Sequence, residues 1–404
     1  MKTQNFIPVL FGGDTNAYSM ARAFYEAYNS LKSEVFAKFQ AGFCAESRIL
    51  NYHVNPQNDT EDAVLASVTA IASANPDKQI LVLGCGDNYI TLISALRPSF
   101  PPNVIAPYIE IDQMMTLIHK ARFYELCETH GVDYPSTVVW TSDMGYDFDI
   151  PFEPPYAVKS AESIQYWNHP FPEQKKAYTA QSREEVYEIL RLIDNSGYKD
   201  SVIIQNFIPG DDSFMRVLTG YAGRDGKVQM MCLGHVLLEE HAPHAIGNHA
   251  LILTESAPEL CEQIRGLLEA IEFKGFFNLD IKLDSRDGKY KVFELNCRQG
   301  RSNYYVTATG CNLAQLLVED LLKGKPQEFH LVDEPSMFHV IPLDVCFDYT
   351  PKLYHPQMRA LMSAKRVQNP LIHPKDRGLR RMLRIQKDAM RMRKHYAQYY
   401  QKPE

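Results

Sequence analysis

The stretch that decides the fold of this chain is GFFNLDIKLDSRDGKYKVFELNCRQGRSNYY, residues 275–305. Apolar residues dominate its first and middle parts, and turn-forming Ser-Arg-Asp-Gly lies between them, so a β-hairpin is predicted. Two acids, Asp280 and Glu294, interrupt the strands, and Asn296 follows. Because side chains alternate along a strand, Glu294 and Asn296 are expected on one face, with Asp280 beside them. Such a cluster of hard oxygen ligands is typical of a Mg²⁺ site next to phosphates.

Two arginines, Arg298 and Arg301, follow the hairpin directly. Their guanidinium groups are suited to phosphate or carboxylate, so an anion site is predicted beside the metal. Lys282 lies two residues after Asp280, and it is expected on the same strand face, where it would help either role. The alternative is a surface hairpin whose polar face happens to carry acids. The convergence of acid, amide and arginine residues on one strand end favours the site.

The order Asp, then Glu-x-Asn, then x-Arg-x-Gly-x-Ser resembles the metal and phosphate hairpin of the ATP-grasp ligases. The wider chain resembles one branch of them, the D-aspartate ligases of bacterial cell-wall synthesis. The stretches that carry this resemblance are FIPVLFGGDTNAYSMARAF at 6–24, VIIQNFIPGDDSFMRVL at 202–218 and MCLGHVLLEEHAPHAIGN at 231–248. It covers roughly residues 5–322 and fades in the C-terminal segment.

The resemblance implies an α/β (α+β) fold in three parts. An N-terminal Rossmann-like pre-ATP-grasp domain would span residues 1–112. A two-subdomain ATP-grasp domain would span 113–325, with its hinge near 205–210. A C-terminal segment with a basic amphipathic helix would occupy 326–404.

The residues themselves indicate an α/β opening. An apolar strand at 6–10 leads through a glycine turn into a helix at 16–28, which is the start of a nucleotide-binding-like unit. A second apolar strand at 80–83 ends in Gly-Cys-Gly-Asp-Asn, residues 84–88. These glycine-acid loops either line a substrate cleft or are plain turns. The fingerprint GxGxxG is absent from the first turn, so no dinucleotide site is predicted.

The resemblance also implies lysines that bind the nucleotide. Lys120, in a helix expected from about 112 to 130, would touch the nucleotide, although on sequence alone it is a helix lysine. Lys159 ends a short apolar strand, where a lysine is costly to bury unless it meets an anion, and it would contact the α- and β-phosphates. The following loop contains no glycine, so Lys175 or Lys176 is preferred as the cationic contact over the triphosphate.

A buried strand at 202–208 ends in Pro-Gly, and the resemblance implies that adenine lies against it at a hinge. Backbone groups of its last residues would read the base. Many relatives have an acid at position 206, where this chain has Asn206, so Asp212 is preferred as the ribose contact. The implied nucleotide contacts of the strand are Gln205, Asn206, Phe207 and Ile208.

Arg216 is expected on an interior strand, pointing at phosphates or at an acyl-phosphate. Several histidines follow it, but their spacing fits no standard zinc site and no cysteine pair accompanies them. A polar loop near the substrate is therefore preferred over a metal site. These histidines are His235, His241, His244 and His249.

At 404 residues, with 45% hydrophobic content, the chain has room for two or three domains with a large core. No apolar run approaches the roughly 20 residues of a membrane helix, and the start lacks the pattern of a signal peptide. Eight cysteines without CxxC spacing indicate reduced thiols. A cytoplasmic location is expected.

The charge is unevenly distributed. Residues 352–404 carry 14 Lys and Arg against 3 Asp and Glu, a net +11, which leaves −18 for residues 1–351. From 376 onward, apolar and basic residues alternate as in a basic amphipathic surface helix. Such a helix either packs on the acidic body or makes a peripheral contact with an anionic membrane at its inner face. No nucleic-acid-binding module accompanies it, so nucleic acid is not an expected partner.

The resemblance implies an ADP-forming ligase that uses ATP and Mg²⁺ to join a carboxylate to an amine through an acyl-phosphate. The D-aspartate branch implies D-aspartate, activated at its side chain, and the lysine amine of a UDP-linked peptidoglycan precursor peptide. Two alternatives stay open: a ligase for another acid and amine, such as a dipeptide synthetase, and a nucleotide-binding, membrane-associated regulator without turnover. The residues given roles are Asp280, Glu294 and Asn296 for the metal, and Arg216, Lys282, Arg298 and Arg301 for catalysis.

Overall fold

The computed structural model describes residues 4–401, and the chain divides into two compact units. The first unit contains Met1–Ile111, Asp211–Asn278 and Asn296–Glu404. The second contains Asp112–Gly210 and Leu279–Leu295. The three-part division expected from the sequence stays a prediction.

A parallel sheet begins the first unit, with strand order β3-β2-β1-β4-β5. The predicted opening of strand, glycine turn and helix is confirmed, because β1 runs through Gly12, at φ +138°, into α1. Asp14 caps that helix by accepting from the backbone of Asn16 and Ala17. The elements are β1 (Phe6–Phe11), α1 (Thr15–Ala27), β2 (Ser33–Ala37), β3 (Leu50–Val54), α2 (Glu61–Ala74), β4 (Gln79–Gly84), α3 (Asp87–Leu96), the 3₁₀ turn η1 (Arg97–Ser99) and β5 (Val104–Ile105).

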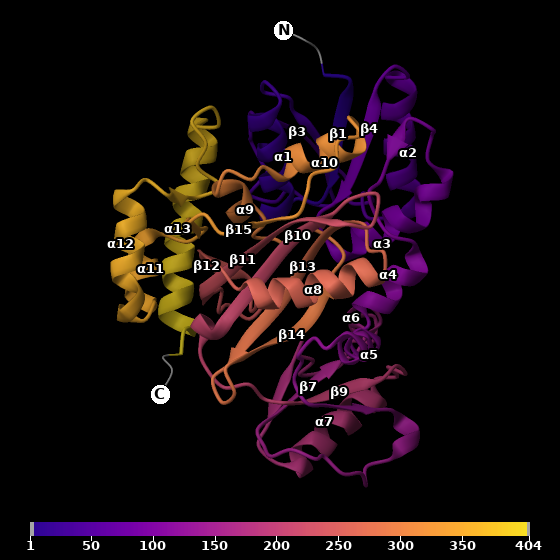
Figure 1. The fold of residues 1–404 in the computed structure, drawn as a ribbon, viewed down its shortest axis with the longest axis vertical. Helices are drawn as coiled ribbons and strands as arrows, with labels where there is room; N and C mark the ends of the chain where they lie inside the picture. Colours follow the sequence, from indigo (N-terminus) through magenta and orange to yellow (C-terminus); the bar gives the residue numbers. More distant parts are fainter. Residues whose placement is uncertain (1–3, 402–404) are drawn as a thin grey trace. The chain divides into compact units, whose positions relative to one another are not determined.

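A second, mixed sheet of the first unit has the order β13-β10-β11-β12-β16-β17, with β15 beside β11. Helix α8 covers part of it (Figure 1). Its strands are β10 (Met215–Ala222), β11 (Val228–Glu239), β12 (His249–Glu255), β13 (Gly275–Asp284), β15 (His330–Val332), β16 (Met337–His339) and β17 (Val367–Gln368). The remaining elements are η3 (Asp212–Phe214), α8 (Pro258–Ala270), α9 (Tyr304–Ala308), α10 (Leu313–Leu321), α11 (Leu343–Tyr349), η4 (Lys352–Tyr354), α12 (His355–Ser363) and α13 (Leu379–Tyr399).

The core of the first unit joins the two sheets through buried aromatic residues. Tyr18 and Phe24 of α1 belong to the same apolar cluster as Tyr221 of β10 and Tyr305 of α9. The Tyr305 hydroxyl donates to the Cys232 carbonyl of β11, so a polar group in this core is satisfied. The residues that follow the predicted hairpin are thereby fixed to the sheet.

The second unit is built on an antiparallel sheet with the order β6-β9-β7-β8. Ser182 caps α7 by accepting from the Glu185 backbone N–H, while the Glu185 carboxylate accepts from the Gln181 backbone N–H. The elements are α4 (Ile111–Ile118), α5 (Lys120–His130), β6 (Thr137–Trp140), η2 (Ser142–Met144), β7 (Tyr156–Ser160), α6 (Ser163–Trp167), β8 (Tyr178–Ala180), α7 (Arg183–Asn195) and β9 (Val202–Asn206).

The single helix predicted from 112 to 130 is wrong, because the structure has two helices there. His119 has an extended backbone, and its ring accepts from the Arg122 backbone N–H, which caps a new helix. The Lys120 N–H donates to the Ala161 carbonyl, outside any helix ladder. Lys120 therefore lies at the first position of α5 rather than in the middle of a helix.

The predicted hairpin is confirmed as β13 and β14 (Lys289–Asn296). Asp284 closes the turn between them, since it is fully buried and accepts from Arg286 and Lys291. From Leu279 onward β13 belongs to the second unit, where it pairs with β14. Within residues 4–401, no helix is both long and apolar enough to cross a bilayer.

Candidate active site

Five ionisable side chains of the second unit come together around Glu294. Its carboxylate lies 3.4 Å from the Lys120 ammonium and 3.9 Å from that of Lys176, and it shares a hydrogen bond with the Asp280 side chain. The Tyr124 hydroxyl of α5 donates to the Phe293 carbonyl at 2.6 Å, which holds β14 against this helix. The lysine–carboxylate group consists of Lys120, Lys159, Lys176, Asp280 and Glu294.

Charge in this group is unbalanced in favour of cations. Burial alone would raise the pKa of Glu294, but the ammonium groups of Lys176 and Lys120 hold that pKa well below its usual range. Burial lowers the pKa of Lys159 to about 8, although the nearby Glu294 carboxylate partly opposes this shift. Three lysines facing two carboxylates are suited to a further anion.

Strand β9, where a hinge was predicted, lies beside Lys159. The Gln205 side chain accepts from the Lys159 ammonium at 3.4 Å and donates to the Thr137 hydroxyl at 3.0 Å. The Asn206 side chain donates to the Glu153 carbonyl, and the Phe207 backbone donates to the Pro155 carbonyl.

Two more predicted site residues lie at the segment that follows β9. The Lys282 ammonium donates to the Gly210 carbonyl at 2.9 Å and lies 5.6 Å from the centre of the Phe207 ring. Ile208 is buried. Lys282 thus contacts the segment after β9, whereas the sequence left its role open.

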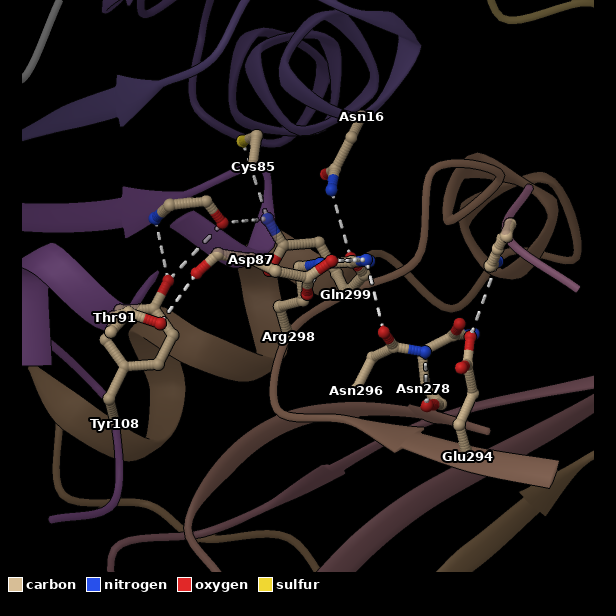
Figure 2. Close-up of polar contacts among 12 residues, drawn as sticks. Asn16, Cys85, Asp87, Thr91, Tyr108, Asn278, Glu294, Asn296, Arg298 and Gln299 are labelled. Carbon is tan, nitrogen blue, oxygen red and sulfur yellow. Dashed lines mark hydrogen bonds and ion pairs between the residues drawn. The ribbon is translucent and has the colours of Figure 1, made fainter. Parts of the chain in front are cut away.

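Arg298, in the first unit, forms a bidentate ion pair with Asp87. Its Nε and Nη2 donate to the two Asp87 carboxylate oxygens at 2.7 and 2.9 Å, as Figure 2 shows. Nη2 also lies 3.3 Å from the Asn296 side-chain oxygen. Asp87 opens α3 directly after the glycine loop of β4. The second glycine-acid loop therefore does meet the arginine that follows the hairpin.

Gln299 anchors this arginine to the parallel sheet. Its side chain donates to the Gly84 carbonyl at 3.2 Å, and its own carbonyl accepts from Asn16 at 3.0 Å (Figure 2). A Cβ at Gly84 would lie 2.8 Å from Ile90, so the close approach of the loop to α3 requires glycine. The start of α1 and the end of β4 thus fix the backbone between Arg298 and Arg301.

Arg301 pairs with acids from two elements. Its Nη1 donates to the buried Glu240 carboxylate at 2.7 Å, and its Nε lies 3.9 Å from the Asp14 carboxylate. Burial raises the pKa of Asp14, although the positive charges of Arg301 and Arg298 oppose the shift. The arginine group consists of Arg298, Arg301, Asp14, Asp87 and Glu240, with more carboxyl groups than guanidinium groups.

Arg216 is buried in a third arrangement, on β10. It forms a close ion pair with Glu255, and its Nη1 donates to the Ser213 and Met215 carbonyls at 2.9 Å. His235 lies opposite Arg216 across the β10–β11 pair, with its Nε2 at 2.7 Å from the Ser213 carbonyl. Burial and the Arg216 charge lower the pKa of His235 to about 4.

Two other histidines of the 235–249 stretch, His241 and His249, contact carboxylates. His241 and the Glu239 backbone N–H both contact Asp212, at 2.8 and 2.9 Å, so the carboxylate preferred for ribose already has two partners. His249 lies 3.7 Å from Glu239. In the described part of the chain, no three His, Cys, Asp or Glu residues form a metal-binding group.

Three acids of the first unit were missed or unassigned by sequence reasoning. Glu240 and Glu255 follow or end apolar strands and carry no local motif, so no sequence signal could have found them. Asp14 lies in the predicted glycine turn, but its contact with Arg301 spans most of the chain. Such long-range partners appear only once the fold is known.

Comparisons with known proteins identify the family. No family model matches the chain. It is 37% identical over 396 residues to a protein named D-aspartate ligase from Enterococcus faecium (strain Aus0004), covering 95% of this chain and 94% of that protein.

Similar solved structures share the fold at low sequence identity. An L-amino acid ligase from Bacillus licheniformis has a TM-score of 0.54 at 16% identity, covering 81% of this chain and 76% of that one. An ADP complex of N5-carboxyaminoimidazole synthetase from Staphylococcus aureus has a TM-score of 0.60 at 14% identity, covering 90% and 87%. With the near full-length match above, these findings show that the chain belongs to the D-aspartate ligases, a branch of the ATP-grasp carboxylate–amine ligases.

Proposed function

We propose that the protein uses ATP and Mg²⁺ to join the side-chain carboxylate of D-aspartate to the lysine amine of a UDP-linked peptidoglycan precursor peptide. The observation that carries this proposal is the 37% identity to a D-aspartate ligase over nearly the whole of both chains. The charges of the lysine–carboxylate group and of the arginine group support it. The first group has a surplus of cations, which suits ATP, and the second has a surplus of carboxyl groups, which suits an amino acid.

ATP would bind at the lysine–carboxylate group. Lys120, Lys159 and Lys176 offer three positive charges to a triphosphate, whose negative charge would offset their mutual repulsion. Adenine would lie against the hinge strand, near Gln205, Asn206, Phe207 and Ile208. In this proposal Asp212 reaches the ribose only if it releases His241.

The same group fits a divalent cation. Asp280 lies beside Glu294, and a divalent cation bound by both carboxylates would offset their mutual repulsion. Asn296, two residues after Glu294 on β14, would add an amide oxygen. A bound Mg²⁺ would neutralise phosphate charge during phosphoryl transfer.

The reaction would proceed in two steps that balance. A side-chain carboxylate oxygen of aspartate attacks the γ-phosphorus, and ADP leaves. The peptide amine then attacks the acyl carbon, and inorganic phosphate leaves with that oxygen while the amine loses a proton. Lys159 would neutralise charge in the first step, and Arg298 would stabilise the oxyanion of the second. Arg216, at the start of β10, would neutralise charge on the transferring phosphoryl group. Lys282, at the proposed hinge, would help to bind phosphate or carboxylate.

Aspartate would bind at the arginine group. Arg298 and Arg301 can exchange Asp87 and Glu240 for substrate carboxylates, since a guanidinium binds either acid in the same bidentate way. The excess of carboxyl groups suits a substrate that also carries an ammonium group. The Asp14 oxygen that faces Arg301 is the proposed acceptor for that ammonium.

The UDP-linked partner places the reaction in the cytoplasm, and we propose that the protein works there at the inner face of the membrane. The basic C-terminal segment supports this location by its net charge.

The proposal is tested by phosphate release from purified protein with Mg-ATP. D-aspartate, L-aspartate and other amino acids are compared, each with and without a lysine-containing UDP-linked pentapeptide. Release that requires both D-aspartate and the peptide supports the proposal. Release with another pair keeps the ligase chemistry and rejects these substrates, and ATP binding without release from any pair favours a non-catalytic regulator.

A further inference from the structure

Helix α13, the yellow helix of Figure 1, is anchored to the first unit by an unusual inward face. Arg381 is only 1% exposed, and it pairs with buried Asp376 at 2.9 Å and donates to the Phe43 carbonyl at 2.7 Å. Its guanidinium also lies 4.4 Å from the centre of the Tyr18 ring. Within the last turn at the other end, the Tyr396 hydroxyl donates to the Glu239 carbonyl. These contacts fix which side of the helix faces the protein.

The opposite side of α13 carries large apolar residues that the protein leaves uncovered. Leu379 is 77% exposed, and Leu383 and Met390 are each 57% exposed. At 100° per residue, these three positions lie within about 40° of one another around the helix, so they form one stripe. An apolar stripe that faces solvent while a different face packs on the protein is available to a partner.

Basic residues border this stripe. Arg380, Lys387 and Lys394 follow the stripe around the helix, and they are exposed. None of the three makes an ion pair or side-chain hydrogen bond with another residue of the 4–401 range. Arg384 and Arg393, by contrast, are paired with Glu46 and Asp344. The α13 outer face, defined as Leu379, Arg380, Leu383, Lys387, Met390 and Lys394, thus combines an apolar stripe with unpaired cations.

We infer that the α13 outer face docks on the surface of an anionic lipid bilayer. An apolar stripe bordered by Lys and Arg is the pattern of helices that lie in a membrane interface, with apolar side chains in the headgroup region and cations near lipid phosphates. The inference deepens the proposed location at the membrane. It does not depend on the substrate pair, so lipid binding and ligase activity can fail separately.

Two other occupants fit the surface less well. A nucleic acid would satisfy the cations, but three exposed aliphatic side chains offer it no stacking platform. A second copy of the chain, paired face to face about a two-fold axis, would bring like charges together. Only a surface that is both anionic and able to accept aliphatic side chains satisfies the whole face.

The test is sedimentation of the full chain with phosphatidylcholine vesicles, with and without phosphatidylglycerol. Binding only to the anionic vesicles, weakened by salt, is expected. Lys387→Gln with Lys394→Gln should bind about 30-fold more weakly, since each basic residue near the surface contributes about fivefold. Leu383→Ser with Met390→Ser should weaken binding at least about tenfold.

Matched controls carry the same changes elsewhere. Lys199→Gln with Lys325→Gln, and Leu192→Ser on α7, alter exposed residues off this face and should keep full binding. The α13 variants should keep the phosphate-release activity on soluble substrates, or the parent melting temperature if the parent has no such activity. Equal binding to both vesicle types, or undiminished binding by both α13 variants, overturns the inference. So does binding of a fluorescent oligonucleotide, or self-association, that depends on these residues while anionic vesicles are not bound.

Discussion

The lysine–carboxylate group and the arginine group differ in how their charges are balanced. In the first, Glu294 contacts two of three lysines, and the cations outnumber the acids. In the second, each arginine already has a carboxylate partner at 2.7 Å, and the acids outnumber the cations. A group with more cations than acids is expected to attract a polyanion such as a triphosphate. A group whose arginines already have carboxylate partners binds a ligand by exchanging those partners, and it can select a zwitterion.

The largest effect on activity is expected from a change in the lysine–carboxylate group. Glu294→Gln removes a carboxylate that contacts two lysines and that we propose as a ligand of Mg²⁺. Phosphate release should fall on the order of 10³-fold, because a bound metal contributes several kcal/mol to phosphoryl transfer. Glu188→Gln, an exposed change on α7 in the same unit, is the matched control and should keep full activity. Comparable rates for the two variants would show that Glu294 is not a ligand of the metal.

The buried Arg216–Glu255 ion pair is a third charged site. Its neighbour His235 can be probed through the dependence of protein stability on pH. This histidine is 12% exposed, and its folded-state pKa of about 4 lies below the unfolded value of about 6.5. As pH falls from 6.5 to 4, the unfolded chain binds a proton that the folded chain resists, so stability is lost on acidification.

This loss should reach about 3 kcal/mol, at 1.36 kcal/mol for each pKa unit. Urea unfolding of the parent and of His235→Gln at several pH values isolates the contribution, because the other titrating groups are shared. The parent should lose more stability than the variant toward acid pH. Parallel curves for the two proteins would show that His235 titrates normally.

Arg298→Lys tests whether the arginine group binds the amino acid by exchanging its carboxylate partners. Lysine keeps the charge but loses the two-armed contact seen with Asp87. The KM for the amino acid should rise about 30-fold, the effect of losing one charged hydrogen bond of about 2 kcal/mol. The KM for ATP should change little. Arg265→Lys on α8 serves as the control, and an equal rise in both KM values would argue against separate substrate roles.

The smallest effect concerns the frame of the second unit. Ser182→Ala removes the side-chain oxygen that caps α7, so the free energy of unfolding should fall by about 1 kcal/mol. Ser182→Asp should restore it, since Asp is an equally good cap. Denaturant unfolding measures both variants, and a stability unchanged in Ser182→Ala would mean that the cap is dispensable.

Local sequence patterns predicted much of this fold. The hairpin of β13 and β14 and the strand-turn-helix opening each follow from signals within a few residues. The helix break at His119 was missed because its cause, contacts with Ala161 and Asp200, lies far along the chain.

The candidate site was predictable only in part for the same reason. Asp280, Glu294 and the arginines stand out as polar residues in an apolar hairpin, and a family resemblance supplied the lysines. Their partners Glu240 and Asp14 come from distant elements, and pairing across such separations leaves no mark in one sequence.

In the proposed reaction, the side-chain carboxylate of D-aspartate is activated as an acyl-phosphate. It is tested most directly with D-aspartate labelled with ¹⁸O in that carboxylate, followed by mass analysis of the phosphate released in the presence of the peptide. One labelled oxygen is expected in each phosphate, because the carboxylate oxygen leaves with the phosphoryl group. Unlabelled phosphate, or label found in AMP, would contradict it.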